Sequence, residues 1–401
     1  MSTQPSLAII SFSPIARDAR VLRQAQYLAP HYDTTVIAFG QRPRELHPEA
    51  RMYQLTLPKG LAPVRKLRTL TLLPLGRVLP ALAYEHWYWK RPDRALALEA
   101  AREIQPELIH ANDWDALPIA VRVAHETGAR VLLDLHEYSP RQFENRTHRR
   151  VFFSPMVDFL LKRYGPSADV VVTVNHSIAD RYAQEYGFQP HVVMNAPSLE
   201  GAPPFTATDE EDVHLIHHGV ASRDRKLEMM VHALSETQPR YSLSFMLVGE
   251  DRRYINSLRS LSEELAPGRV SFLPPVPPGR IVTHIGQFDL GFVLLPPTSF
   301  SYYVALPNKF FDFVMAGLGV ILGPSPEMSS LASEYGFGAV APSFDASDTA
   351  QLLNGLSAED IDNMKHKALQ ARQYLNADAE MSKLLTLYSD LTNGANPERR
   401  R

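Results

Sequence analysis

A lysine and an aspartate three positions apart stand in a short apolar segment of the C-terminal half, LPNKFFDFVMAGLGVIL. Asn308 is a residue type that caps helices, and Gly317 suits the left-handed position that ends them. The pattern predicts a helix with Lys309 in its first turn and Asp312 about one turn further along. Free N–H groups and a cation there would bind a nucleotide diphosphate, and a carboxylate suits ribose hydroxyls. A capped helix whose lysine and aspartate pair through solvent fits the same spacing.

Other polar residues follow predicted strands, which is where ligands gather in open parallel sheets. Gly219 and Arg225 come after the predicted strand HLIHH, and Arg225 offers a second cation for a diphosphate. In the N-terminal half, His136 and Glu137 follow the run RVLLDL. A single histidine at a strand end can equally be structural, because imidazole readily satisfies loop backbone groups.

The triplet Asp113–Trp114–Asp115 raises the question of a bound metal, because two nearby aspartates can ligate a cation. Asp115, however, precedes a helix predicted from Ala116, where it would act as a cap without any metal. We therefore predict no metal site and leave the role of Asp113 open.

Apolar runs alternate with amphipathic segments in both halves of the chain, which indicates buried parallel strands covered by helices. The N-terminal strands are expected at 7–12, 34–39, 107–110, 130–135, 170–174 and 192–194, with helices over 18–28, 116–126 and 177–186. The C-terminal strands are expected at 214–218, 243–248, 270–273, 291–295 and 320–322, with helices near 227–235 and 252–265, from 309, and over 358–391. The fold class is therefore α/β, with two doubly wound parallel sheets.

A length of 401 residues suits two such domains, and a segment rich in Pro, Gly, Ala, Ser, Thr and acids separates the two patterns. We place an N-terminal domain at 1–197, a linker at 198–212 and a C-terminal domain at 213–377. The helix expected at about 378–395 can pack back on the N-terminal domain.

The segment 306–321 resembles a stretch of the retaining glycosyltransferases of family 4, of the form SLPNKLFEYMAAGLPVI. HGVASRDRKLE resembles the family's HGGLSPGRGLE, VLLDLHEYSP its DSHELFPE signature, HANDWD its HxHD-type turn, and DARV its DxRV helix start. The resemblance implies the GT-B architecture, in which two Rossmann-like domains face each other across a cleft. The acceptor would bind the N-terminal domain and the nucleotide-sugar donor the C-terminal one.

By this resemblance Arg225 and Lys309 hold the donor diphosphate and stabilise it as it leaves, which makes both residues catalytic. Asp312 would contact the ribose, with Asn308 and Gly219 completing the donor site. In the family a second acid stands eight positions before the acid at Asp312 and contacts the donor sugar. This chain has Val304 there, so that contact does not carry over.

On the N-terminal domain, the resemblance places His136 at the donor sugar as a third catalytic residue. It places Asp18, Arg20, Asp113 and Glu137 on the acceptor side.

The function expected is retaining transfer of a hexosyl group, most simply from a UDP-sugar, without a metal or other cofactor. The acceptor would be a glycan, a lipid-linked sugar or a small molecule in the synthesis of cell-surface polysaccharide or glycoconjugates. Two alternatives stay open: a catalytically inactive GT-B protein that binds nucleotide-sugar or glycan as a partner, and a non-hydrolysing UDP-sugar 2-epimerase.

Composition and charge place the protein in the cytoplasm. The net charge of -3 favours no nucleic-acid partner, Cys is absent, and the N-terminus lacks a basic leader with an apolar core. Residues 59–94 are nevertheless basic and rich in leucine and aromatic residues, a profile typical of a segment at a membrane surface. Such a segment could make peripheral contact with the inner face of the cytoplasmic membrane, or its apolar side could pack on its own domain. Its bases are Lys59, Arg65, Lys66, Arg68, Arg77, Lys90, Arg91 and Arg94.

Overall fold

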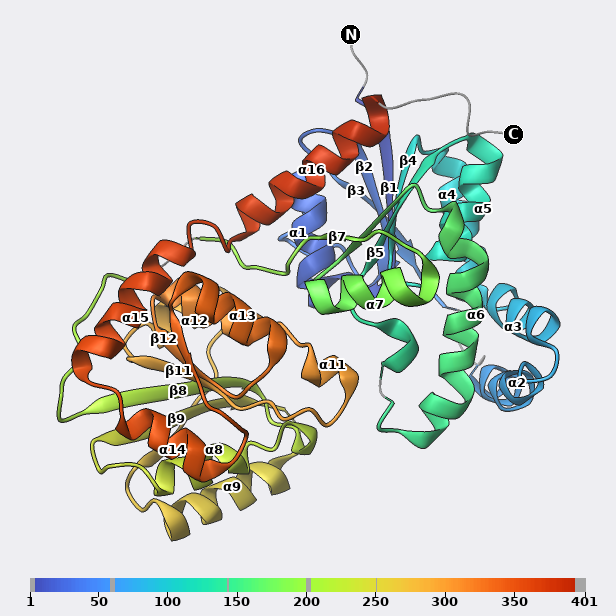
Figure 1. The fold of residues 1–401 in the computed structure, drawn as a ribbon. Coiled ribbons are helices and arrows are strands. Elements are labelled where there is room, and N and C mark those ends of the chain that lie inside the picture. Colours follow the sequence, from blue (N-terminus) through green and yellow to red (C-terminus); the bar gives the residue numbers. More distant parts are fainter. Residues whose placement is uncertain (1–3, 58–61, 143, 200–202, 250, 394–401) are drawn as a thin grey trace. The chain divides into compact units, whose positions relative to one another are not determined.

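A computed structural model describes residues 4–57, 62–142, 144–199, 203–249 and 251–393. The chain divides into two compact units (Figure 1). The first comprises the described residues of Met1–Met194 and Met381–Arg401, and the second those of Asn195–Glu380. Each unit is an α/β layer structure of its own.

The first unit is built on a parallel sheet with the strand order β3-β2-β1-β4-β5-β6-β7. Its central strands are continuous apolar runs because helices cover both faces and leave no face for water. The strands are β1 (Ser6–Pro14), β2 (Asp33–Phe39), β3 (Arg51–Leu55), β4 (Leu108–Asn112), β5 (Arg130–Leu135), β6 (Val170–Thr173) and β7 (His191–Val192).

Helices on this sheet include one from the far end of the chain. Met381, Leu384 and Tyr388 of α16 (Ala377–Asn393) share a core with Val21 and Leu28 of α1 (Ala19–Leu28), and Figure 1 shows these two helices side by side. The others are α2 (Ala62–Leu75), α3 (Pro80–Trp89), α4 (Pro92–Ile104), α5 (Leu117–Thr127), α6 (Ser154–Tyr164) and α7 (His176–Tyr186).

The second unit repeats the plan with the order β10-β9-β8-β11-β12-β13. Its strands are β8 (Val213–Val220), β9 (Tyr241–Val248), β10 (Val270–Leu273), β11 (Leu290–Val293), β12 (Gly319–Leu322) and β13 (Gly338–Val340). Its helices are α8 (Glu228–Ser235), α9 (Arg252–Leu265), α10 (Ile281–Ile285), α11 (Phe300–Tyr303), α12 (Asn308–Ala316), α13 (Pro326–Tyr335), α14 (Ala346–Asn354) and α15 (Ala358–Ala371).

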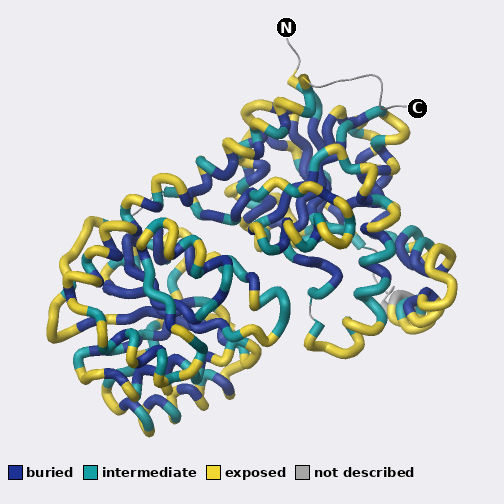
Figure 2. The backbone as a smooth tube through the Cα atoms, viewed as in Figure 1, coloured by how far each residue is buried: buried dark blue, intermediate teal, exposed yellow. Residues whose placement is uncertain are grey.

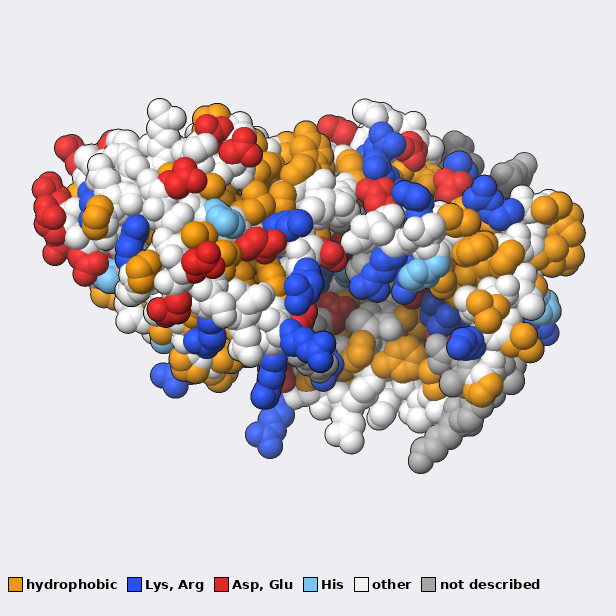
Figure 3. Space-filling view, turned by 90° about the horizontal axis from the view of Figure 1, so that it is seen from below, with side chains coloured by type: hydrophobic (Ala, Val, Ile, Leu, Met, Phe, Trp, Pro, Cys, Tyr) orange, Lys and Arg blue, Asp and Glu red, His pale blue; other side chains and the backbone are white. Residues whose placement is uncertain are grey.

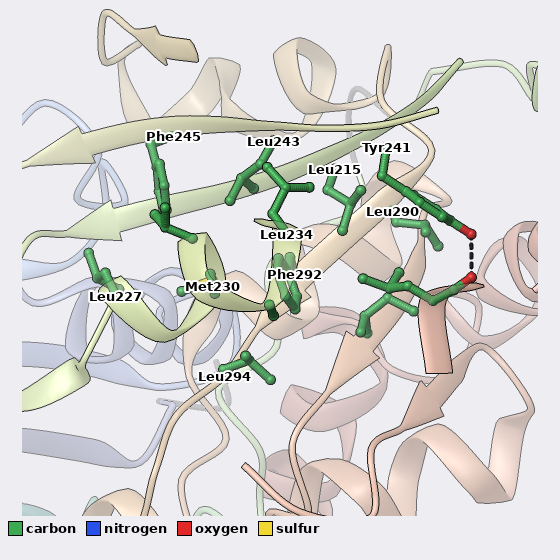
Figure 4. Packing of buried hydrophobic residues seen from close by; sticks show 14 of the residues in the cluster. Leu215, Leu227, Met230, Leu234, Tyr241, Leu243, Phe245, Leu290, Phe292 and Leu294 are labelled. Carbon is green, nitrogen blue, oxygen red and sulfur yellow. Dashed lines mark hydrogen bonds between the residues drawn. The ribbon is translucent and has the colours of Figure 1, made fainter. Parts of the chain in front are cut away.

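The core of the second unit lies between β8, β9, β11 and the helix α8 (Figure 4). Leu227, Met230 and Leu234 of the α8 segment pack under Leu243 and Phe245 of β9. The hydroxyl of Tyr241 closes one edge of this core by donating a hydrogen bond to the carbonyl of Leu353. In both units the central strands are buried and the outer helix faces are exposed (Figure 2).

Both sheets reverse their strand order at one point, between β1 and β4 in the first unit and between β8 and β11 in the second. Ligands of doubly wound sheets bind beyond the carboxyl ends of the strands at such a point. Short helical turns occupy several connections: 3₁₀ turns at Ile15–Arg17, Ser139–Arg141, Gly165–Ser167, Arg223–Arg225 and Pro278–Arg280, and a π turn at Arg149–Phe153.

Three local predictions are wrong. Asn308 is the first residue of α12 rather than its cap, because Pro307 holds the extended conformation of the cap position. Asp115 does not cap α5; Ala116 is in that position, and the Asp115 carboxylate accepts a hydrogen bond from Arg94 instead. The helix expected over 358–391 is two helices, α15 and α16, separated at residues 372–376.

From residue 62 on, the basic segment 59–94 folds into α2, α3 and the start of α4. Trp87 and Tyr88 are buried at 4% and 0% exposure, so these aromatic side chains pack on their own unit. Lys59 and the side chain of Arg65 lie outside what the structure describes. Among the described helices, none has the length and apolar character needed to cross a membrane.

Candidate functional site

Two cations converge on Gly219 at the end of β8. A Cβ atom at Gly219 would lie 3.3 Å from Lys309 Nζ and 3.8 Å from a terminal guanidinium nitrogen of Arg225. The backbone there has φ +119°, a conformation that side-chain-bearing residues rarely adopt. Glycine therefore permits both the chain path and the close approach of the two cations at the sheet's reversal point.

Arg225 is positioned by the tight connection between β8 and α8. A 3₁₀ turn carries Arg223–Arg225, and Lys226 ends it with φ +52°. The hydroxyl of Thr298 donates a hydrogen bond to the carbonyl of Asp224, 3.1 Å away. The connection after β11 thus braces the turn that holds Arg225.

Lys309 is positioned by α12, whose buried apolar face includes Phe310, Phe313 and Val314. Gly317 ends the helix with φ +73°, as the sequence predicted. Packing of that face leaves Lys309 almost enclosed, at 7% exposure, with its ammonium at the end of β8. Asn308 begins the helix, and its side-chain oxygen accepts a hydrogen bond of 3.1 Å from Asn195.

Two consecutive histidines of β8 contact the two charged residues of α12. His217 Nε2 lies 2.7 Å from Lys309 Nζ, and His217 Nδ1 lies 2.7 Å from the carbonyl oxygen of Phe292. His218 Nε2 lies 3.4 Å from Asp312 Oδ2. We call these six residues the β8–α12 cluster: His217, His218, Gly219, Arg225, Lys309 and Asp312.

The electrostatics of the β8–α12 cluster favour an anion. Burial lowers the pKa of Lys309 well below its usual range and the neighbouring Arg225 lowers it further, although Asp312 opposes the shift. Burial, followed by Lys309, likewise lowers the pKa of His217, and lowers that of His218 to about 3. A bound anion would relieve the repulsion between the two cations and favour the protonated form of Lys309.

The first unit holds a second polar cluster, centred on a carboxylate inside the sheet. Asp134 of β5 is fully buried and accepts two hydrogen bonds of 2.8 Å from the guanidinium of Arg20 and one from Gln24. The Nε2 atoms of His110 and His136 each lie 3.4 Å from Asp134 Oδ2. The pKa of Asp134 is held well below its usual value because the surrounding charges, Arg20 first, outweigh the burial that would raise it.

His136 is the exposed edge of this Asp134 cluster, since 24% of its side chain is accessible whereas Arg20, His110 and Asp134 are enclosed. Its Nε2 lies 3.2 Å from Asn112 Oδ1, an acceptor, so Nε2 carries a proton. Burial lowers the pKa of His136, but the carboxylate of Asp134 outweighs burial and raises the net value.

The remaining residues predicted on the acceptor side make local contacts. Asp18 caps α1 by accepting from the amide of Val21 at 3.1 Å, and the hydroxyl of Ser13 donates to it at 2.5 Å. Arg20 is enclosed against Asp134 and donates a further bond of 3.0 Å to the carbonyl of Val193. Glu137 lies beside His136, and its backbone carbonyl accepts from Tyr182 at 2.8 Å.

The two aspartates of the triplet 113–115 are paired with protein groups. Asp113, at φ +66°, accepts from the amide of Trp114 at 2.8 Å and from Ser139 Oγ at 2.9 Å. Asp115 lies 3.0 Å from Arg94, and burial raises the pKa of Asp115 to about 6 against the opposing effect of that arginine. Within the described part of the chain, no three His, Asp or Glu side chains group as they would to hold a metal ion.

The structure thus brings Gly219, Arg225, Lys309 and Asp312 together in the second unit. The sequence motifs did not point to His217, His218 or Asp134. A signal for each was present, because a charged residue inside the buried run RVLLDL and two histidines ending a strand both need polar partners.

Known proteins resemble this chain in sequence over part of its length and in fold over nearly all of it. Residues 19–199 match the model of Glycosyltransferase Family 4. Sucrose-phosphate synthase from Thermosynechococcus elongatus superposes with a TM-score of 0.73 at 15% identity, over 98% of this chain and 100% of that one. HepE of Anabaena in complex with UDP and glucose gives 0.67 at 15% identity, over 96% and 100%. The α,α-trehalose 6-phosphate synthase of Burkholderia multivorans gives 0.65 at 10% identity, over 100% and 99%.

None of the curated proteins compared with the chain matches it significantly in sequence. The paired doubly wound sheets and these structural neighbours define the fold as GT-B. The match of residues 19–199 to the Glycosyltransferase Family 4 model agrees with the resemblance that the sequence motifs predicted.

Proposed function

We propose that this glycosyltransferase transfers a sugar from a UDP-sugar to an acceptor with retention of anomeric configuration and without a metal. The observation that carries the proposal is the convergence of Lys309 and Arg225 on Gly219. HepE, which shares the fold, was crystallised with UDP and glucose, and this supports UDP as the nucleotide here.

The residues of the β8–α12 cluster suit a leaving diphosphate. When the bond between the sugar and the diphosphate breaks, negative charge grows on the diphosphate oxygen, and two fixed cations stabilise that charge. The acceptor hydroxyl bonds to the anomeric carbon on the same face, and its proton passes to the departing diphosphate. Asp312, one helical turn beyond Lys309, would accept hydrogen bonds from the ribose hydroxyls.

On the first unit we place the acceptor and the transferred sugar beside His136, the accessible member of the Asp134 cluster. Its Nε2 proton is held toward Asn112, which orients the ring and leaves Nδ1 to accept a hydrogen bond from a sugar hydroxyl, or to donate one when the ring is protonated. Asp113 and Glu137 border the same strand ends and are the acceptor-side residues of the proposal. Asp18 and Arg20 act there through the structure, as a helix cap and as the partner of Asp134.

Calorimetry with UDP, GDP, ADP and their sugar conjugates tests the donor site, followed by product analysis with the sugar that binds. Lys309→Met and Arg225→Gln should each lower kcat by about two to three powers of ten, as loss of one oxyanion donor does. Arg223→Gln, a neighbouring exposed arginine, is the matched control and should keep near-normal turnover. Normal turnover in Lys309→Met would rule the proposal out. Binding of UDP-sugar without transfer favours the inactive partner, and conversion of the sugar without release of UDP favours the epimerase.

We also propose a lipid-linked acceptor at the inner face of the cytoplasmic membrane, because α2 and α3 expose an apolar and basic surface. Leu67, Leu70 and Val78 are 64%, 63% and 76% exposed, and Leu75, Leu79 and Leu82 are exposed beside them. No Asp or Glu occurs from residue 50 to residue 84, whereas Lys66 and Arg77 are exposed in that range. Figure 3 shows apolar side chains gathered with basic ones over this end of the first unit.

Such a surface suits anionic lipid, since leucine side chains enter the headgroup region and the bases face lipid phosphates. Leu67→Ser/Leu70→Ser/Val78→Ser should reduce sedimentation with phosphatidylglycerol vesicles by at least about tenfold. The matched variant with Met at the same positions should sediment as the wild type does. Equal sedimentation of the serine variant, or no preference for phosphatidylglycerol over phosphatidylcholine, would refute membrane contact.

A further inference from the structure

His217 holds Lys309 through a hydrogen bond whose direction the structure fixes. The carbonyl of Phe292 can only accept, so the proton of a neutral His217 ring is on Nδ1, 2.7 Å from that oxygen. Nε2 is then an acceptor, and it lies 2.7 Å from Lys309 Nζ, which donates. The ring is 2% exposed and lies edge-on to Phe245, so it cannot turn away.

The choice of a neutral acceptor matters for an anion site. A carboxylate in the place of His217 would pair with the ammonium and cancel the charge that a diphosphate needs. A neutral imidazole orients the same ammonium while leaving its full charge for the ligand. Removal of the imidazole would leave a buried ammonium with one acceptor fewer, and the protonated form would become less stable.

His218 occupies the next position and contacts Asp312 rather than Lys309. It is 5% exposed, its ring is edge-on to Phe313, and its Nε2 makes no hydrogen bond within the described residues. Because burial lowers its pKa to about 3, the ring is neutral, and the 3.4 Å approach to Asp312 is a polar contact rather than an ion pair.

We propose that His217 and His218 are positioning residues of the donor site, with His217 orienting Lys309 toward the diphosphate and His218 orienting Asp312 toward the ribose. This inference rests on the proposed function for the identity of the ligand. The two histidines are neighbours in β8 but act on different parts of the ligand. A substitution of either one is therefore a control for the other.

The charged and titratable groups around Lys309 determine how the affinity for a diphosphate should depend on pH. They are His217 and His218 of β8, Arg225 of the following turn and Asp312 of α12 itself. Affinity for a diphosphate falls as pH rises through the pKa of Lys309, because the neutral amine no longer attracts the ligand. Loss of the acceptor at His217 moves that midpoint to lower pH.

The experiment measures the affinity of the full chain for UDP and for inorganic pyrophosphate by calorimetry between pH 7 and pH 10. In His217→Phe we expect the midpoint to move down by about one pH unit and both ligands to bind at least about tenfold more weakly at pH 8. His217→Gln, whose amide oxygen can accept from Lys309, should restore most of the affinity. His218→Phe should weaken UDP binding alone and leave the midpoint and the affinity for pyrophosphate unchanged.

An unchanged midpoint in His217→Phe, or equal losses for both ligands in His218→Phe, would overturn the inference. If His217→Phe does not fold, His217→Met serves in the same comparison. Failure of the proposed function has a different signature: pyrophosphate would still bind with the pattern above, but no UDP-sugar would be consumed.

Discussion

At the scale of the residue, Gly219 is a position in the proposed donor site that no side chain can occupy without strain. Its φ of +119° strains any side-chain-bearing residue, and a Cβ there would meet Lys309 Cε and Nζ at 3.3 Å. Gly219→Ala should therefore lower the free energy of unfolding by about 1–3 kcal/mol and displace the ammonium. We expect UDP affinity measured by calorimetry to fall by at least about tenfold. Gly268→Ala is the control, because Gly268 has φ +72° with open space around it, and this variant should lose stability but keep UDP affinity.

Asp134 is the residue on which the polar cluster of the first unit depends. Asp134→Asn leaves the buried Arg20 without its carboxylate, and breaking such a pair costs about 3–5 kcal/mol of unfolding free energy. The same change removes the charge that raises the pKa of His136, so that pKa, followed by NMR of the imidazole, should fall.

The matched control for that variant is Asp33→Asn, which breaks an aspartate–arginine pair of 2.7 Å with both partners exposed. We expect a loss of no more than about 1 kcal/mol there, because solvent screens the pair. Equal losses for the two variants, or an unmoved His136 pKa in Asp134→Asn, would contradict the assignment of Asp134 as the centre of the cluster.

At the scale of the element, α16 completes the first unit from the far end of the chain. The Tyr388 hydroxyl lies 2.7 Å from His110 Nδ1, and the Tyr388 ring packs 5.5 Å from that of Tyr32. Tyr388→Phe keeps the packing but leaves a buried imidazole nitrogen unpaired, at a cost of about 1–3 kcal/mol in urea unfolding. Tyr374→Phe, at a side chain that is 66% exposed, should cost almost nothing. A similar stability for both variants would show that the bond to His110 contributes little.

The elements also show what the sequence can and cannot reveal. The strands β1, β2, β5 and β9 were predictable because buried parallel strands are largely apolar runs, and α9 because its apolar residues recur at helical spacing. The helices α2 to α4 were not predicted, since their basic and apolar residues mix without a single clear face. Lys309 and Arg225 were identified through local motifs. The Asp134 cluster was not identified in this way. Arg20 and Asp134 are 114 residues apart in the sequence, and only the folding of the sheet brings them together.

At the scale of the whole molecule, acid should weaken the two units through different groups. The pKa of His110 in the first unit is lowered chiefly by burial, and that of His218 in the second unit is lowered to about 3. A histidine kept neutral by the fold binds its proton only after unfolding, so its contribution to stability is present above about pH 6.5 and is lost as pH falls toward the folded pKa. As pH falls through that window, each such histidine lowers the free energy of unfolding by about 1.4 kcal/mol per pH unit. His136 opposes this trend, because its pKa is raised.

The two contributions can be measured separately, because all three tryptophans, at 87, 89 and 114, lie in the first unit. Tryptophan emission during urea unfolding therefore follows the first unit, and circular dichroism follows both. The unfolding transition that dichroism detects, and that emission does not, belongs to the second unit. Between pH 6 and pH 4.5, His218→Phe should reduce the slope of that unit's free energy of unfolding against pH by about 1.4 kcal/mol per pH unit. Asp134→Asn should alter the transition seen by emission. If His218→Phe changed the emission transition instead, or left both slopes as in the wild type, the neutral state of His218 in the folded protein would be refuted.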